Sequence, residues 1–222
     1  FPFEPELLRA RGVAASYVGH PLADAIPPEP PRAAARAALG LGETEPVVAL
    51  LPGSRRSEIE AIAPVFLQAA ARLQRLRPAL RFVLPVAPGL RARVEPLAAA
   101  HAPGVALQLL DGRSHEALAA CDLTLIASGT ATLEAALFKR PMVIAYRMHP
   151  LSWQIMKRMA YQPWVGLPNI LCRDFVVPER LQEDCNPARL EADVLAGLDD
   201  AAGAARLRAR FEILDVGARV IL

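Results

Sequence analysis

Two short segments combine a flexible backbone with side chains that bind anions. In the first, LLPGSRRSEIE at residues 50–60, an apolar run stops at Pro-Gly-Ser, presents two arginines and continues into an acidic stretch. Gly53 allows close backbone approach to a ligand, Ser54 offers a hydroxyl, and Arg55 can bind a phosphate through its fork of N–H donors. The segment predicts a site for a phosphorylated ligand. A capped turn with solvated arginines is the structural alternative.

The second segment is LTLIASGTATLEAAL at residues 123–137. An apolar run ends in Ser128, Gly129 and Thr130, and a helical pattern begins almost at once, so helix N–H groups and hydroxyls would face an anion together. Glu134 falls about one turn into that helix, where a carboxylate can accept hydrogen bonds from a pair of sugar hydroxyls. Its alternative role is to complement the helix dipole. Neither segment carries the glycine-rich dinucleotide or P-loop fingerprint.

The elements that position these segments alternate between short apolar runs and helix-length stretches. Such runs are typical of buried parallel strands, and the pattern predicts an α/β fold: a Rossmann-like parallel sheet with helices on both faces. In such sheets ligands bind beyond the carboxyl ends of the strands, which is where both segments lie. The expected strands are residues 47–51, 81–86, 105–110, 123–127 and 142–146.

After the first segment, residues 65–76 place their apolar side chains three and four apart, as on one face of a helix. Proline fits the first turn of a helix better than its interior, so Pro64 predicts that this helix starts there and that residues 57–62 form a separate short turn. Ser57 and Glu60 match the spacing of a capping box.

Changes in composition divide the chain into four parts. Residues 1–26 are expected to be the tail end of a preceding domain, with its last strand, and the proline-rich residues 27–46 a linker with a short helix at 33–39. Residues 47–178 are expected to form the ligand-binding domain, and residues 179–222 the closing helices. Because the chain starts at Phe1 without a signal-peptide pattern, an upstream domain is expected to be missing.

The net charge, composition and residue spacing of the chain argue against several classes of function. A net charge of +2 gives no support for nucleic-acid binding, and no apolar run is long enough to span a bilayer. The three cysteines, Cys121, Cys172 and Cys185, are scattered and predict free thiols in a reducing compartment. Without an H-E-x-x-H motif or a cluster of histidines and carboxylates, no protein-bound metal is expected.

Five motifs together resemble the lipid A disaccharide synthase family of inverting glycosyltransferases, which have the two-domain GT-B architecture. They are YVGHPLADAIP (17–27), LLPGSR (50–55), ASGTATLEAAL (127–137), RPMVIAYRM (140–148) and VGLPNIL (165–171). The resemblance covers essentially the whole chain and corresponds to the C-terminal half of a family member. It implies a donor, UDP-2,3-diacylglucosamine, and an acceptor, 2,3-diacylglucosamine 1-phosphate. The products would be lipid A disaccharide 1-phosphate and UDP, with no further cofactor.

The resemblance also implies roles for individual residues. Arg55 would stabilise the leaving diphosphate, as a magnesium ion does in other transferases, and Glu134 would bind the ribose. The other implied donor contacts are Gly53, Ser54, Ser128, Gly129, Thr130, Thr132 and Asn169.

The general base is less well defined. His20, beside Asp24 in GHPLAD, is a candidate, although a histidine in a turn is often structural. The family's acidic candidates belong to the N-terminal domain, so this chain alone is expected to be inactive.

A basic and aromatic segment follows the second motif. No acidic residue occurs between Glu134 and Asp174, and this interval holds both tryptophans. Such a composition is typical of a segment lying on an anionic bilayer, and ordinary core packing with a solvated basic face is the alternative. Because the implied substrates carry acyl chains, we expect a protein peripheral to the cytoplasmic face of the inner membrane. The residues expected to contact the membrane are Trp153, Lys157, Arg158 and Trp164.

Three other functions are compatible with the residues. One is a different GT-B enzyme that uses UDP-GlcNAc, such as the peptidoglycan transferase or the non-hydrolysing 2-epimerase, although LPGSR and LPNIL fit these less well. Another is a non-catalytic module that binds a nucleotide sugar and acts through a partner. The third is a purely structural α/β domain.

Overall fold

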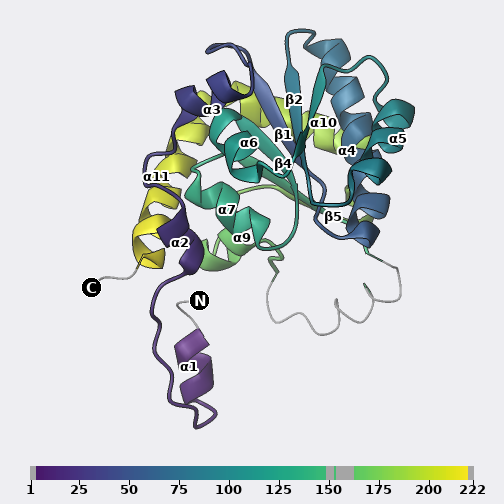
Figure 1. The fold of residues 1–222 in the computed structure, drawn as a ribbon. Coiled ribbons are helices and arrows are strands. Elements are labelled where there is room, and N and C mark those ends of the chain that lie inside the picture. The colour runs from purple at the N-terminus through teal and green to yellow at the C-terminus, as the bar shows by residue number, and fades with distance from the viewer. Residues whose placement is uncertain (1–3, 149–152, 154–162, 220–222) are drawn as a thin grey trace.

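A computed structural model describes residues 4–148, 153 and 163–219. Its centre is one parallel sheet of six strands in the order β3-β2-β1-β4-β5-β6 (Figure 1). The order reverses between β1 and β4, which pair from Val48 with Leu123 to Leu51 with Ile126. The strands are β1 Val47–Leu51, β2 Arg81–Val86, β3 Leu107–Asp111, β4 Leu123–Ala127, β5 Met142–Tyr146 and β6 Glu179–Leu181.

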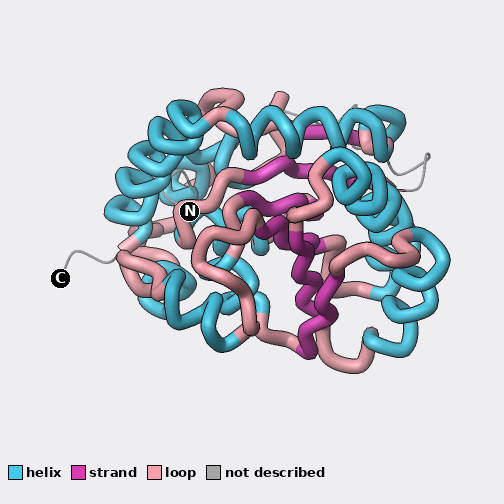
Figure 2. The backbone as a smooth tube through the Cα atoms, turned by 90° about the horizontal axis from the view of Figure 1, so that it is seen from above, coloured by secondary structure: helices cyan, strands magenta, loops and turns pink. Residues whose placement is uncertain are grey.

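Helices cover both faces of this sheet, as Figure 2 shows from above. The helices α3, α6, α7, α9 and α11 share one buried apolar cluster with one face, and α4, α5 and α10 share a second cluster with the other. The predicted α/β class and all five predicted strands are therefore confirmed. The helices given by the described residues are α1 Glu4–Arg9, α2 Pro21–Ala25, α3 Arg32–Ala38, α4 Arg56–Leu76, α5 Arg91–His101, α6 Ser114–Ala120, α7 Ala131–Leu137, α9 Leu167–Cys172, α10 Pro187–Asp199 and α11 Ala201–Ala218, with a short 3-10 helix at Gln182–Asp184.

The strands form where the sequence is continuously apolar. Every residue of β1 and β4 is buried, as expected for central strands packed on both faces. Each of these two strands ends at one of the two anion-binding segments, so the fold places both segments at the same edge of the sheet. This is the point where the strand order reverses and where ligands of such sheets bind.

The helix after the first segment is longer than predicted. α4 is continuous from Arg56 to Leu76 with Pro64 inside it, so the predicted separate turn at 57–62 is wrong. Ile59 and Ile62, which precede Pro64, are buried in the same cluster as the rest of the helix. Their packing offsets the hydrogen bond that a proline removes.

The start of α4 also differs from the prediction. Arg55 is the N-cap residue of α4, and the carboxylate of Glu58, three residues later, accepts a hydrogen bond from its N–H. The predicted Ser57–Glu60 capping box is therefore wrong. Glu60 instead pairs with Arg56 along the outer face of the helix, at 2.8 Å.

Two terminal segments differ from the expected elements. The described residues 4–26 hold the helices α1 and α2 and no strand, so the strand expected there is wrong. At the other end, β6 and a 3-10 helix precede the closing helices α10 and α11, so residues 179–222 are not all helical. With only three residues at the sheet edge, β6 is too short to show an alternating pattern. The helix predicted in the linker is confirmed as α3.

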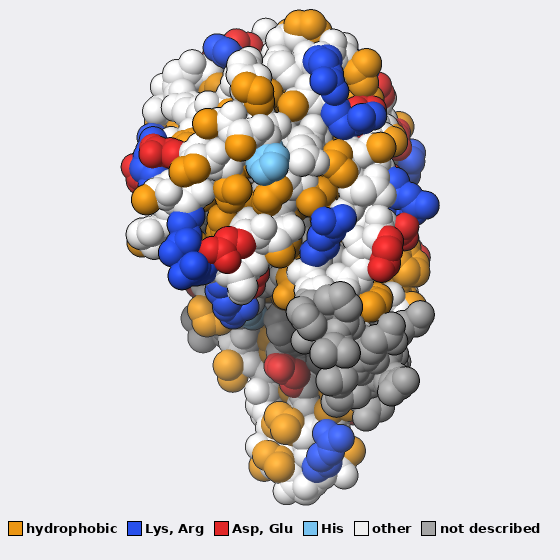
Figure 3. Space-filling model, turned by 90° about the vertical axis from the view of Figure 1, so that its right-hand side faces the viewer, with side chains coloured by type: hydrophobic (Ala, Val, Ile, Leu, Met, Phe, Trp, Pro, Cys, Tyr) orange, Lys and Arg blue, Asp and Glu red, His pale blue; other side chains and the backbone are white. Residues whose placement is uncertain are grey.

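Charged side chains of opposite sign are mixed on the surface that carries α4 and α5 (Figure 3). Arg93 reaches Glu60 at 3.2 Å, and Arg91 lies between Glu95 and Asp111. Nucleic-acid-binding proteins gather their basic residues on one face. On the face that carries α4 and α5, basic and acidic side chains are instead interspersed.

Candidate functional site

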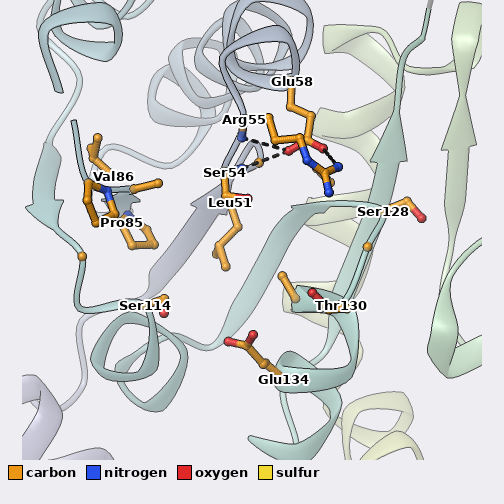
Figure 4. A pocket seen from close by; sticks show the side chains of 17 residues that line it. Leu51, Ser54, Arg55, Glu58, Pro85, Val86, Ser114, Ser128, Thr130 and Glu134 are labelled. Carbon is orange, nitrogen blue, oxygen red and sulfur yellow. Dashed lines mark hydrogen bonds and ion pairs between the residues drawn. The ribbon is translucent and has the colours of Figure 1, made fainter. Parts of the chain in front are cut away.

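A cavity of about 470 Å3 opens at the carboxyl ends of β1, β2 and β4 (Figure 4). Both anion-binding segments line it, so the structure brings together most of the predicted contacts. These are Gly53, Ser54, Arg55, Ser128, Gly129, Thr130 and Glu134. The prediction that the two segments share one crevice is confirmed.

Two further loops line the cavity and carry no motif in the sequence. The first comprises the end of β2, Pro85 and Val86, with Ala87 and Pro88 after it, and the second holds Gly112 and Ser114 after β3. Pro85 and Val86 form an apolar side of the cavity, across from Ser128 (Figure 4). Their position at the end of a strand was the signal that could have identified them, because every carboxyl strand end of such a sheet faces the same crevice.

The first loop is shaped by Gly53 and Glu58. Gly53 has a φ of +122°, and a Cβ placed there would lie 2.5 Å from Oε2 of Glu58. Any other residue would therefore be strained and would collide with this carboxylate. Glu58 itself lines the cavity and is bonded to the loop, a role that the sequence did not indicate.

The second loop is held from within. Gly129 has a φ of +152°, and the hydroxyl of Thr132 donates to its carbonyl at 2.7 Å. Thr132 is fully buried and does not line the cavity, so its predicted ligand contact is replaced by this internal bond. The Ser128 hydroxyl donates to the carbonyl of Val165 at 3.3 Å. Of the residues predicted to bind a ligand in this loop, Thr132 therefore shapes the loop, whereas Ser128, Gly129 and Thr130 line the cavity.

Glu134 projects into the cavity from α7 and is 19% exposed. Burial raises the pKa of its carboxyl above the ordinary value, and the neighbouring His115 opposes this rise. The two side chains approach to 3.5 Å between Nε2 of His115 and Oε2 of Glu134. His115 lies on α6. It was not among the predicted site residues, because no sequence pattern links it to Glu134, 19 positions later.

Asn169 lies outside the cavity. Its side chain is fully buried: Nδ2 donates to the carbonyl of Val177 at 2.9 Å, and Oδ1 accepts from the N–H groups of Val176 and Val177. Because these groups use its hydrogen-bonding capacity, the structure does not support direct contact between Asn169 and a ligand. Its position inside a local network explains why the motif alone was misleading.

His20 also lies away from the cavity of Arg55. It is the N-cap of α2, and its Nδ1 accepts from the N–H of Leu22 at 3.2 Å. The imidazole lines a different cavity, of about 500 Å3, together with Tyr17 and residues of α9 and α11. The structure therefore favours the structural role of this histidine over the catalytic one.

The expected membrane segment lies mostly in the undescribed part of the chain. Lys157 and Arg158 are outside the described residues. Trp153 is half-buried, and Trp164 is half-buried with its ring packed edge-on against Phe175, 6.1 Å between centroids. Within the described residues no helix is both long and apolar enough to cross a bilayer.

The cysteines are free thiols, as predicted. Burial raises the pKa of Cys121 to about 12 and that of Cys185 to about 11, so both are protonated at neutral pH. A protonated thiol is a poor nucleophile. In the part of the chain that the structure describes, no three histidine, cysteine or carboxylate side chains gather as a metal site would need.

Comparison with known proteins identifies relatives over most of the chain. The family model for lipid-A-disaccharide synthetase matches residues 1–210. A lipid-A-disaccharide synthase from Albidiferax ferrireducens is 62% identical over 90% of this chain and 51% of its own length. One from Thiobacillus denitrificans is 55% identical over 96% of this chain and 57% of its own. The chain spans about half the length of the curated relatives it matches.

Solved structures resemble the fold at low sequence identity. WaaG, a glycosyltransferase involved in lipopolysaccharide biosynthesis, aligns with a TM-score of 0.55 at 14% identity, over 90% of this chain and 50% of its own. A UDP-GlcNAc 2-epimerase from Neisseria meningitidis, bound to UDP-GlcNAc, aligns with a TM-score of 0.54 at 11% identity, over 85% of this chain and 43% of its own. These likenesses confirm the GT-B type of α/β fold. The sequence matches add the family: the chain belongs to the lipid-A-disaccharide synthetases.

Proposed function

We propose that this chain supplies the donor-binding part of a lipid-A-disaccharide synthase. The full protein would transfer 2,3-diacylglucosamine from UDP to 2,3-diacylglucosamine 1-phosphate and release UDP. The observation that carries the proposal is the convergence of Arg55, the 128–130 loop and Glu134 on one cavity at the carboxyl edge of the sheet. The family match over most of the chain supports the choice of substrates.

The diphosphate would bind between the two loops. Among the described residues that line the cavity, Arg55 is the single basic residue, and Glu58 and Glu134 are the two acidic residues. Retention of a diphosphate would therefore depend strongly on Arg55, assisted by hydroxyls and backbone N–H groups of the loops. As the bond to the sugar breaks, charge grows on the leaving phosphate, and a positioned guanidinium stabilises that charge.

The nucleoside would occupy the rest of the cavity. Glu134 would accept hydrogen bonds from the ribose hydroxyls, and the apolar side formed by Pro85 and Val86 suits a planar base. The carboxylate of Glu134 must be ionised for the strongest contact of this kind. His115, 3.5 Å away, favours that ionised form.

In the transfer step the acceptor hydroxyl would form a bond to the anomeric carbon while the bond to the diphosphate breaks with inversion. The hydroxyl proton passes to a general base, and UDP carries away the electron pair. We assign this base to no residue of the chain, because His20 lies in another cavity. The base would belong to the remaining half of the protein, so the chain alone would bind donor without turnover.

The acylated substrates would be taken from a membrane surface. We propose that the segment around Trp153, Lys157, Arg158 and Trp164 contacts anionic lipid on the cytoplasmic face of the inner membrane. Its support is compositional, since cationic side chains and tryptophans without acidic neighbours suit such a surface.

Calorimetric titration of UDP and of uridine into this chain tests the proposal. We expect UDP to bind and uridine to bind much more weakly, because the diphosphate supplies the charged contacts. Competition between UDP-GlcNAc and UDP-2,3-diacylglucosamine would separate this function from that of a UDP-GlcNAc enzyme, since only the lipid enzyme should prefer the acylated donor. A folded chain that binds neither UDP nor an acylated UDP-sugar would contradict the proposal.

A further inference from the structure

The anion-binding donors of the first loop already hold an anion that belongs to the chain. Oε2 of Glu58 accepts from the N–H of Ser54 at 3.0 Å and from the N–H of Arg55 at 3.2 Å. Its other oxygen, Oε1, lies 2.9 Å from Nη1 of Arg55. These contacts are drawn in Figure 4, where the carboxylate and the guanidinium meet at the cavity wall.

The position of Glu58 is closely defined. Its side chain is 15% exposed and packs against Gly53, where a Cβ would come within 2.6 Å of the Cβ of Glu58. Arg55, by contrast, is 79% exposed and extends into the cavity. The carboxylate is therefore held by the loop, whereas the guanidinium can turn to a ligand.

We propose that Glu58 acts as an internal anion that competes with the diphosphate of a bound nucleotide for Arg55 and for the loop N–H groups. The inference rests on the proposed function. One carboxylate carries a single negative charge, so a nucleoside diphosphate displaces it from Arg55 more readily than a weaker anion does. Glu58 thereby lowers the affinity of the site for phosphate-bearing ligands, UDP and pyrophosphate included, and speeds the release of UDP after transfer.

The test is Glu58→Gln, in which an amide oxygen can still accept from the two loop N–H groups while the charge is lost. The matched control is Glu60→Gln. Glu60 loses the same charge from the same helix, but it pairs with Arg56 and Arg93 on the outside and does not line the cavity. UDP, inorganic pyrophosphate and uridine are titrated into the wild-type chain and both variants.

We expect Glu58→Gln to bind UDP and pyrophosphate about fivefold more tightly, a modest gain typical of a partly exposed ion pair. The dissociation rate of UDP should fall by a similar factor. Uridine binding should not change, and Glu60→Gln should behave like the wild type. In an Arg55→Ala background the gain from Glu58→Gln should largely disappear, because the charge no longer has a shared partner.

Weaker or unchanged UDP binding by a folded Glu58→Gln chain would overturn the inference and assign Glu58 a purely supporting role. If that variant does not fold, Glu58→Asp replaces it. This substitution withdraws the carboxylate by one methylene and should also tighten UDP binding, and weaker binding would again overturn the inference. Failure of the proposed function looks different, because the wild-type chain would then not bind UDP at all. The pyrophosphate titration would still report on the competition at Arg55.

Discussion

Asn169 donates from Nδ2 to Oε1 of Glu179 at 2.8 Å, and Glu179 accepts the N–H groups of Val165 and Gly166, each at 2.9 Å. The carbonyl of Val165 in turn accepts from the hydroxyl of Ser128, which lines the cavity. Asn169 is thus connected to the nucleotide site through the segment 165–166. It holds the segment that contacts Ser128, and its own side chain does not line the cavity.

Replacing Asn169 by Asp should destabilise the fold. An aspartate oxygen in place of Nδ2 would face the carbonyl of Val177 and the carboxylate of Glu179. Each buried group left without a partner costs about 1–3 kcal/mol. Urea denaturation should show a reduced free energy of unfolding that recovers partly at low pH, where a protonated aspartate can donate again.

The control for this substitution is Asn186→Asp. Asn186 is the N-cap of α10 and accepts from the N–H of Arg189 at 3.1 Å, a bond that aspartate also makes. Its Nδ2 donates to the carbonyl of Glu183 at 2.9 Å in an exposed position, where water can replace the lost donor. The free energy of unfolding should change little there. Equal losses in the two variants would contradict the internal role of Asn169.

Arg55→Ala should weaken UDP binding by about 1.5–3 kcal/mol, as the loss of a charge-assisted hydrogen bond does. The control is Arg56→Ala, because Arg56 is 64% exposed, pairs with Glu60 and does not line the cavity. Calorimetric titrations at low and physiological salt should show a large loss only for Arg55→Ala. A similar loss for both variants would indicate a general charge effect.

Glu134→Gln should stabilise the chain increasingly as pH rises. Burial raises the pKa of Glu134 in the folded chain, so between the unfolded value, about 4.3, and the folded value the folded state binds more protons. As pH rises through this window, the free energy of unfolding of the wild type therefore falls relative to that of the glutamine variant. Above the window the difference between the two proteins stays constant. Urea denaturation between pH 4 and 8 measures the difference.

Glu116→Gln provides a control of opposite sign. The hydrogen bond from Arg113 lowers the pKa of Glu116, so its stabilising contribution is present above the ordinary pKa and is lost as pH falls. The variant should therefore lose stability relative to the wild type at neutral pH and match it in acid. The same pH trend in both variants would contradict the assignment for Glu134.

Exchanging Lys157 and Arg158 for Glu should weaken binding to vesicles that contain anionic phospholipid and leave binding to neutral vesicles unchanged. Each basic residue near such a surface contributes about 1 kcal/mol. Arg206→Glu with Arg208→Glu, on the exposed side of α11, gives the same change in net charge elsewhere. Co-sedimentation that is unaffected by the first pair would count against the membrane segment.

The sequence alone determined the frame of the protein. Continuous apolar runs identified β1, β2, β4 and β5 with their observed bounds, because central parallel strands are buried on both sides and leave a local pattern. The rule that ligands bind beyond strand ends then placed Arg55 and Glu134 in one crevice. These inferences succeeded because periodicity and strand ends are properties of neighbouring residues.

Only the tertiary structure decided which polar residues face a ligand. Asn169 and Thr132 share motifs with cavity residues, yet both are fully buried and bonded internally. Glu58 and His115 carry no motif and yet contact Arg55 and Glu134. Polar side chains of the same type can either satisfy buried groups or remain open to a ligand. Which of these occurs depends on contacts between segments far apart in the chain, and local patterns do not record such contacts.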